Sequence, residues 1–158
     1  MRIERFRHAD GEEVSREIVR KPGVVAVVAH DGRDLWLVRQ PREAIGDPDS
    51  LEIPAGRLDK EGEAPLTAAR RELAEEIGCA ADTWETMPSF HPSSGFTDEL
   101  VHMYLATDLR EQSADSGENE RIEIVRWPLA DIDAAIDATS DAKTLIGLQW
   151  LRRALRRA

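Results

Sequence analysis

The sequence carries three carboxylates, Glu72, Glu75 and Glu76, within one short stretch beside Arg70 and Arg71. At about 100° per residue on a helix, the three carboxylates fall within an arc of roughly 100°. Like charges at this spacing weaken a helix by roughly 0.2–0.5 kcal/mol per pair, and a cation held between them reverses that cost. Oxygen ligands without nearby Cys or His favour a hard ion, Mg²⁺ or Mn²⁺, which also binds phosphates.

The surrounding residues predict how these carboxylates are positioned. Pro65 suits a first helical turn and Gly78 suits a left-handed stop, so residues 65–77 are expected to form a short helix. Its apolar stripe comprises Leu66, Ala69, Leu73 and Ile77. A short strand, residues 51–55, is expected to run into a loop at Gly56. Three glutamates alone fit a solvated acidic face better than a metal site, but a strand, a glycine loop and a carboxylate helix together predict a metal–phosphate site.

Residues 56–79 resemble the Nudix box, whose pattern is Gly, five residues, Glu, seven residues, Arg-Glu-apolar-x-Glu-Glu-x-Gly-apolar. From Glu63 onward the match is complete, through Arg71-Glu72-Leu73, Glu75-Glu76, Gly78 and Cys79. The departure is at the front, where six residues rather than five separate Gly56 from Glu63. A loop containing Gly62 is expected to absorb the extra residue.

Flanking segments are similar to those of the ADP-ribose pyrophosphatases within this family. Residues 90–99, Phe-His-Pro-Ser-Ser-Gly-Phe-Thr-Asp-Glu, resemble their Ser-Pro-Gly-Phe-x-Asp-Glu stretch, and Gln40-Pro41-Arg42 resembles their Gln-x-Arg. One departure is Ser94, which stands where the marker proline is usual, with Pro92 two residues earlier. The resemblance implies five substrate-binding residues: Arg16, Arg42, Ser94, Gly95 and Glu99.

The same resemblance implies roles around the metal. The Ala55 carbonyl, Glu72 and Glu76 would hold the ion, and Glu75 would bind it or orient water. Glu63 would be structural, pairing with Arg70 or Arg71. The general base is expected to be Glu118 or Glu120, in a polar loop over residues 112–121 that could equally be an ordinary surface loop. The arginines near the C-terminus are interpreted as favourable charges at a helix end rather than as a binding patch.

Composition favours a small enzyme. A chain of 158 residues suits a single domain over 1–158, and a net charge of −10 argues against nucleic-acid binding. No apolar run is long enough to span a bilayer, and the N-terminal residues lack the apolar segment of a signal peptide, so a cytoplasmic location is expected. The one cysteine, Cys79, is expected to fill the core.

The pattern of apolar residues predicts mixed α and β structure. Strands are expected at 24–30, 34–40, 100–107 and 121–127, with Asp31-Gly32 as a hairpin turn, and helices at 129–138 and 143–157. Residues 3–7 and 13–19 are expected to form an N-terminal hairpin within residues 1–22. Helices around mixed strands suit an α/β/α sandwich, which is also the Nudix fold that the resemblance implies.

The resulting hypothesis is an Mg²⁺-dependent pyrophosphohydrolase that cleaves ADP-ribose, or a related nucleoside diphosphate sugar, to AMP and ribose 5-phosphate. The resemblance also implies a homodimer in which the hairpin carries Arg16 to the partner's pocket. Two alternatives are a housecleaning hydrolase of nucleoside triphosphates and a non-catalytic nucleotide-sugar sensor. The ADP-ribose-like flanks count against the first alternative. The retained carboxylates, and a length that leaves no room for a DNA-binding domain, count against the second.

Overall fold

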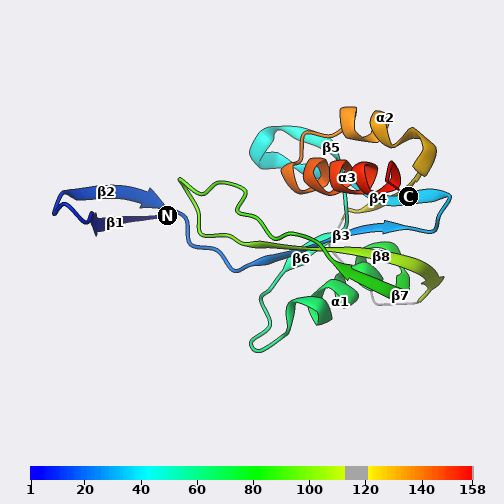
Figure 1. Ribbon diagram of the computed structural model, residues 1–158, viewed down its shortest axis with the longest axis horizontal. Coiled ribbons are helices and arrows are strands. Elements are labelled where there is room, and N and C mark those ends of the chain that lie inside the picture. Colours follow the sequence, from blue (N-terminus) through cyan, green and yellow to red (C-terminus); the bar gives the residue numbers. More distant parts are fainter. Residues whose placement is uncertain (113–120, 158) are drawn as a thin grey trace.

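The computed structural model describes residues 1–112 and 121–157, which form a mixed β-sheet between helices and a separate two-stranded hairpin (Figure 1). The seven strands of the sheet are β3 (Val24–His30), β4 (Asp34–Arg42), β5 (Asp47–Glu52), β6 (Ala55–Arg57), β7 (Cys79–Thr86), β8 (Val101–Glu111) and β9 (Glu123–Pro128). The main path is β5-β4-β3-β8-β7, while β6 pairs with β3 and β9 pairs with β4. Only β3 and β8 are parallel among these pairs of described strands.

The central strand β3 is buried on both faces. Because successive side chains of a strand point to opposite sides, Val25, Val27 and Ala29 join one apolar cluster while Ala26 and Val28 join another. None of these five side chains is more than 1% exposed. A continuous apolar run without alternation is typical of a strand that is covered on both faces, and the sheet therefore needs a helical layer on each side.

Three α-helices supply those layers (Figure 1). Helix α1 (Pro65–Ile77) packs on the face of Val25 and Val27, whereas α2 (Ile132–Asp137) and α3 (Ala142–Leu155) pack on the opposite face. Helix α3 approaches the sheet closely at Gly147, where a Cβ would lie 2.7 Å from the side chains of Val28 and Met103. The predicted α/β/α sandwich with a mixed sheet is thus confirmed.

The N-terminal hairpin projects away from the sheet (Figure 1). Strands β1 (Arg2–Arg7) and β2 (Glu13–Ile18) pair in continuous antiparallel register, as the sequence predicted. Its apolar side chains Ile3 and Phe6 are 72% and 41% exposed. The Arg20 guanidinium fastens the base of the hairpin, because it donates to Glu4 at 2.9 Å and to Asp98 at 3.0 Å.

Several expected elements differ in extent. The strand expected at 51–55 is two strands, since β5 ends at Glu52 and β6 begins at Ala55, so Gly56 lies within a strand rather than a loop. The helix expected at 129–138 begins as a 3₁₀ turn, Leu129–Asp131, before α2. Strand β7 was not predicted, because Ala-Ala-Asp-Thr has low strand propensity, and it forms by pairing with β8 at the sheet edge.

Other expectations hold. The Asp31-Gly32 turn joins β3 and β4, although the two strands pair only beside the turn, at Ala29–Trp36 and His30–Leu35. Cys79 is 2% exposed within the apolar cluster on the α1 side. No helix formed by residues 1–112 and 121–157 combines the length and apolar character needed to cross a membrane.

Candidate active site

Helix α1 presents its carboxylates beside its core-facing stripe. Pro65 occupies the first turn, and Gly78 ends the helix at φ 64°, where its N–H donates to the Ala74 carbonyl. Leu73 and Ile77 are buried in the core, so their packing fixes the rotation of the helix about its axis. Glu72, Glu75 and Glu76 consequently line one cavity beside the helix.

Arg71 holds several of these carboxylates together. Its guanidinium donates to both oxygens of Glu63 at 3.2 and 3.0 Å, to Glu72 Oε1 at 2.6 Å and to Glu75 Oε2 at 2.8 Å. The hydrogen bonds to Arg71 lower the pKa of the Glu63 carboxyl. The predicted structural role of Glu63 is supported, with Arg71 as its partner. Arg70 instead lies over the Trp84 ring, 5.8 Å from its centroid.

Strand β6 forms the wall that faces α1. The Ala55 N–H donates to Glu76 Oε2 at 3.0 Å, which ties the strand to the helix. A Cβ on Gly56 would lie 1.9 Å from the Glu72 carboxyl carbon, so only glycine allows this approach. The extra residue between Gly56 and Glu63 is taken up in a turn with Gly62 at φ 77°, as expected.

A cavity of about 720 Å³ opens between α1, β6 and the end of β4. Helix α1 contributes three of its carboxylates and Arg71, and the remaining charged side chains come from other parts of the chain. The charged side chains along it are Lys21, Arg42, Arg57, Asp59, Lys60, Arg71, Glu72, Glu75, Glu76 and Glu99. Such a cavity offers carboxylates for a cation and nitrogen donors for an anion within one space.

The donor set fits a hard divalent ion. Among the residues that the structure describes, no three acidic, His or Cys side chains converge on one metal position as they stand. The Arg71 guanidinium, however, already bridges Glu72 and Glu75, and so marks a place where positive charge is stabilised between them. Carboxylate oxygens without Cys or His in the cavity suit Mg²⁺ or Mn²⁺ rather than zinc.

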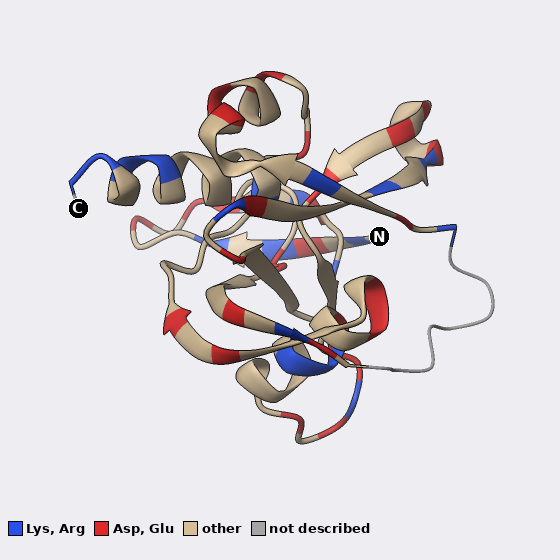
Figure 2. Ribbon diagram, turned by 90° about the vertical axis from the view of Figure 1, so that its right-hand side faces the viewer, with Lys and Arg blue, Asp and Glu red and all other residues tan. Residues whose placement is uncertain are grey.

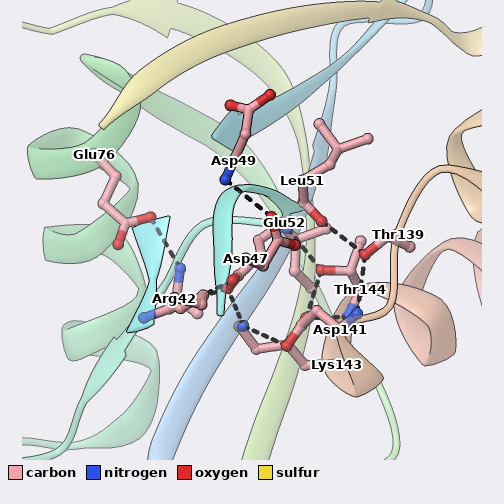
Figure 3. Close-up of polar contacts among 12 residues, drawn as sticks. Arg42, Asp47, Asp49, Leu51, Glu52, Glu76, Thr139, Asp141, Lys143 and Thr144 are labelled. Atoms are coloured by element: carbon pink, nitrogen blue, oxygen red, sulfur yellow. Dashed lines mark hydrogen bonds and ion pairs between the residues drawn. The ribbon is translucent and has the colours of Figure 1, made fainter. Parts of the chain in front are cut away.

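Arg42 enters the cavity from the end of β4 and is held by a buried carboxylate (Figure 3). Its Nε and Nη2 each donate to one oxygen of Glu52 at 2.6 Å, a two-point contact that fixes the guanidinium plane. Lys143 of α3 also contacts Glu52, which is 1% exposed. Burial alone would raise the pKa of Glu52, but the hydrogen bond from Arg42 and the charge of Lys143 outweigh it and lower the pKa to about 2.

Comparison with known proteins assigns this arrangement. The NUDIX domain model matches residues 19–147, which includes the carboxylate helix and the strands around the cavity. The chain belongs to the Nudix family. It is therefore a Nudix hydrolase similar to the ADP-ribose pyrophosphatases.

Individual relatives show the extent of the similarity. The Nudix chain is 38% identical over 148 residues to the ADP-ribose pyrophosphatase of Bacillus subtilis (strain 168), covering 90% of this chain and 79% of that protein. The values are the same for the methanol dehydrogenase activator of Bacillus methanolicus. A crystal structure of an ADP compounds hydrolase has the same fold, with a TM-score of 0.86 and 24% sequence identity over 98% of this chain and 84% of that one.

The Nudix cavity brings together six of the predicted site residues, Arg42, Ala55, Glu72, Glu75, Glu76 and Glu99. Ser94 and Gly95 lie in an exposed turn and do not line this cavity. Arg16 lies exposed on the projecting hairpin, where it donates to the Ser15 carbonyl. Glu118 and Glu120 lie outside the described residues, so their role stays a prediction.

Sequence reasoning missed several residues of the Nudix site. Lys21 lies outside the compared motifs, and Arg57 and Lys60 occupy variable positions of the box, yet all three line the cavity. Glu52 and Lys143 were also missed, although the sequence around Glu52 indicates its role. A glutamate between Leu51 and Ile53, in an otherwise apolar run, implies a buried charge that needs a cationic partner.

Proposed function

We propose that the protein is an Mg²⁺-dependent pyrophosphohydrolase that cleaves the diphosphate of ADP-ribose, or of a related nucleoside diphosphate sugar, to AMP and ribose 5-phosphate. The observation that carries the proposal is the single cavity in which the α1 carboxylates face Arg42 and Lys21. Hydrolysis of a diphosphate requires carboxylates that bind a metal and cationic donors that bind phosphate, because the metal and the donors must reach the same phosphate oxygens. The similarity to ADP-ribose pyrophosphatases favours this substrate class.

The metal would be held by Glu72, Glu76 and the Ala55 carbonyl, with Glu75 binding it or orienting the attacking water. When bound, Mg²⁺ supplies positive charge that neutralises the diphosphate oxygens as the bond breaks. Arg71 would then remain paired with Glu63, since that contact uses Nε and Nη2 rather than the Nη1 that reaches Glu72 and Glu75. Through this contact Arg71 would stay beside Glu72 and Glu75 and keep their carboxylates oriented.

The remaining residues would handle the substrate and the proton. Water attacks one phosphorus of the diphosphate, its proton passes to a carboxylate, and the bridging P–O bond breaks to release two phosphate monoesters. We assign the carboxylate to Glu118 or Glu120, by resemblance, and the grip on phosphate or the terminal sugar to Arg42. Ser94, Gly95 and Glu99 complete the proposed substrate contacts, and Glu99 already lines the cavity.

We further propose that the protein acts as a homodimer in which the hairpin carries Arg16 to the partner's cavity. The projecting hairpin, with Ile3 72% exposed, supports this because a two-stranded hairpin is marginally stable unless it packs on another surface. A cytoplasmic location remains a prediction from the sequence.

A substrate panel tests the reaction. ADP-ribose, GDP-mannose and the nucleoside triphosphates are each incubated with Mg²⁺. Sugar-nucleotide cleavage is read as phosphate released by an added phosphatase, and triphosphate cleavage as phosphate released by an added pyrophosphatase. We expect kcat/KM to be higher for ADP-ribose than for any triphosphate. Faster turnover of a triphosphate would instead support the housecleaning alternative, and no turnover of any substrate would support the sensor.

The base assignment is tested on the same assay. A general base increases the rate by roughly 10²–10⁴-fold. The turnover rates of Glu118→Gln and Glu120→Gln are therefore expected to differ sharply, with a large loss in one variant and a small loss in the other. Two near-normal variants would contradict the assignment and transfer the role of base to Glu75.

A further inference from the structure

The start of helix α3 is fastened to strand β5 directly behind the cavity (Figure 3). Asp141 caps the helix, because its Oδ2 accepts from the Thr144 N–H at 2.9 Å and from the Thr144 hydroxyl at 2.7 Å. The Thr144 oxygen in turn accepts from the Ile53 N–H at 2.9 Å. These bonds fix where the second residue of the helix, Lys143, can place its ammonium group.

The Lys143 ammonium group lies between two carboxylates. It contacts Glu52 Oε2 and donates to Asp141 Oδ1 at 2.9 Å. The same Glu52 oxygen accepts from Arg42 Nη2, so one buried carboxylate is shared between a cation of the helix and a cation of the cavity. The Lys143 side chain is 13% exposed, which reduces screening of its charge by water.

The charges of this cluster balance with Lys143 present. Arg42 and Lys143 are cationic while Glu52 and Asp141 are anionic, so the sum is zero, and a neutral residue at 143 would leave it at −1. A negative cluster beside Arg42 would repel a diphosphate, because the charge of Glu52 would then be offset by Arg42 alone. Arg42 can bind an anion because Lys143 neutralises part of the negative charge of Glu52.

We propose that Lys143 is a positioning residue for Arg42: by sharing the buried Glu52 carboxylate, it keeps the guanidinium oriented and electrostatically free to bind a substrate phosphate. The inference rests on the proposed function, since it assigns Arg42 to the diphosphate. Lys143 itself does not line the cavity. Its effect is therefore on substrate affinity and leaves the carboxylates of α1 untouched.

Steady-state kinetics with ADP-ribose tests the proposal. Lys143→Met is expected to raise KM on the order of tenfold with kcat within about twofold, because an interaction present equally in the ground and transition states is lost. Lys143→Arg, which keeps the charge, is expected to restore most of the affinity. A merely structural residue would lower kcat through loss of folded enzyme and leave KM unchanged, and that result would overturn the proposal.

The matched control is Arg152→Met. Arg152 lies on the same helix, and replacing it by Met changes the net charge of the protein by the same amount. It pairs instead with Asp133 at 2.7 Å, near the arginine-rich C-terminal end of the helix (Figure 2). We expect its KM to stay at the wild-type value. A KM rise equal to that of Lys143→Met would mean that overall charge is responsible and would overturn the proposal. If Lys143→Met does not fold, Lys143→Gln, which retains a donor for Asp141, replaces it.

A double substitution tests whether Lys143 acts through Arg42. In an Arg42→Met background, Lys143→Met is expected to add little to the rise in KM, since the group that it positions is gone. Equal effects in both backgrounds would overturn the proposal.

Binding of inorganic pyrophosphate separates this inference from the proposed function. Each protein is titrated with pyrophosphate in the absence of metal, and the ¹⁵N-resolved NMR signal of the Arg42 Nε–H is followed. We expect this signal to shift in wild type, and the same shift in Lys143→Met to need on the order of tenfold more pyrophosphate. An equal response in both proteins, or none in wild type, would overturn the role of Lys143. Failure of the substrate panel alone would overturn only the assigned reaction.

Discussion

At the scale of single residues, Glu76 is the most buried of the three carboxylates Glu72, Glu75 and Glu76. It is 8% exposed, and its Oε2 accepts the Ala55 N–H, so one side of the carboxylate is already fixed by the protein. A carboxylate held in this way is largely withdrawn from solvent. This distinguishes it from the ordinary acidic helix face that the sequence alone left open.

Glu76→Gln is expected to lose activity on the order of 10²-fold or more while the fold survives, since the change removes charge with hardly any change in volume. The measurement is kcat/KM at saturating Mg²⁺, together with the apparent Mg²⁺ affinity and the melting temperature. Retention of wild-type turnover and wild-type Mg²⁺ affinity would show that the metal-helix assignment is wrong.

Glu52 gives a prediction about acid stability. Its folded-state pKa is lowered from the ordinary value of about 4.5 to about 2. A carboxyl with a lowered folded pKa contributes stability that is fully present above its unfolded pKa, and this is lost as the pH falls from about 4.5 toward 2. The contribution is on the order of 3 kcal/mol. Urea unfolding of wild type and Glu52→Gln at several pH values measures it.

We expect wild type to exceed Glu52→Gln in free energy of unfolding at pH 7, and the difference to shrink as the pH approaches 2. The comparison between the two proteins removes the contributions of the other carboxyls that titrate in the same window. A difference that does not change with pH would contradict the assigned pKa of Glu52.

At the scale of elements, the spacing between β6 and α1 is set by one missing side chain. Gly56→Ala would place a methyl group 1.9 Å from the Glu72 carboxyl carbon, so that carboxylate must move. Because the group that moves is the end of a flexible side chain, the fold should tolerate the change. We expect the melting temperature to fall by only a few degrees, a shift of about 1 kcal/mol in a domain of this size.

The cost of Gly56→Ala is instead expected in metal affinity and turnover. A change in the supports of a metal ligand typically costs roughly 10–100-fold. Calorimetric Mg²⁺ titration and kcat with ADP-ribose measure the two quantities. Near-normal values for both would mean that Glu72 does not hold the ion.

The elements also show how far the sequence could predict the structure. Helix α1 was predicted from Pro65 to Ile77 because its end signals and apolar stripe are local. Strand β7 was missed because its stability comes from pairing with β8, a distant partner that leaves little local pattern. The cluster of Glu52, Lys143 and Arg42 was missed for the same reason, since it joins β4, β5 and α3 and no spacing along the chain reveals it.

The site could be predicted to a similar degree. The box motif predicted the carboxylates and narrowed the partner of Glu63 to Arg70 or Arg71, because these residues lie on one helix and the turn before it, and the structure shows Arg71. Ser94 and Gly95, predicted from a flanking segment, lie outside the cavity of this chain. Lys21 comes from a segment outside the motifs and Lys60 from a variable position of the box, so their place in the cavity required the structure.

At the scale of the whole molecule, the hairpin is the element without a packing partner in the chain described. Light scattering at micromolar concentration is expected to give the mass of a dimer, because burying Ile3 and Phe6 against a second copy would stabilise an element that is marginal alone. Phe6→Asp is expected to shift the protein toward monomer, and Arg16→Met to raise KM. A monomer with full activity would rule out the dimer arm.

The parallel pairing of β3 with β8 has a consequence for folding kinetics. Val24 pairs with Val101, and the chain between them contains β6 and the whole of α1. Closing so long a loop is entropically costly and slow, and nothing rewards it until the two strands meet. Helix α1 packs on Tyr104 and Ala106 of β8 as well as on β3, so its core-facing side is complete only after that event. We therefore expect the full packing of α1, the helix that carries the carboxylates, to follow the pairing of β3 with β8 during folding.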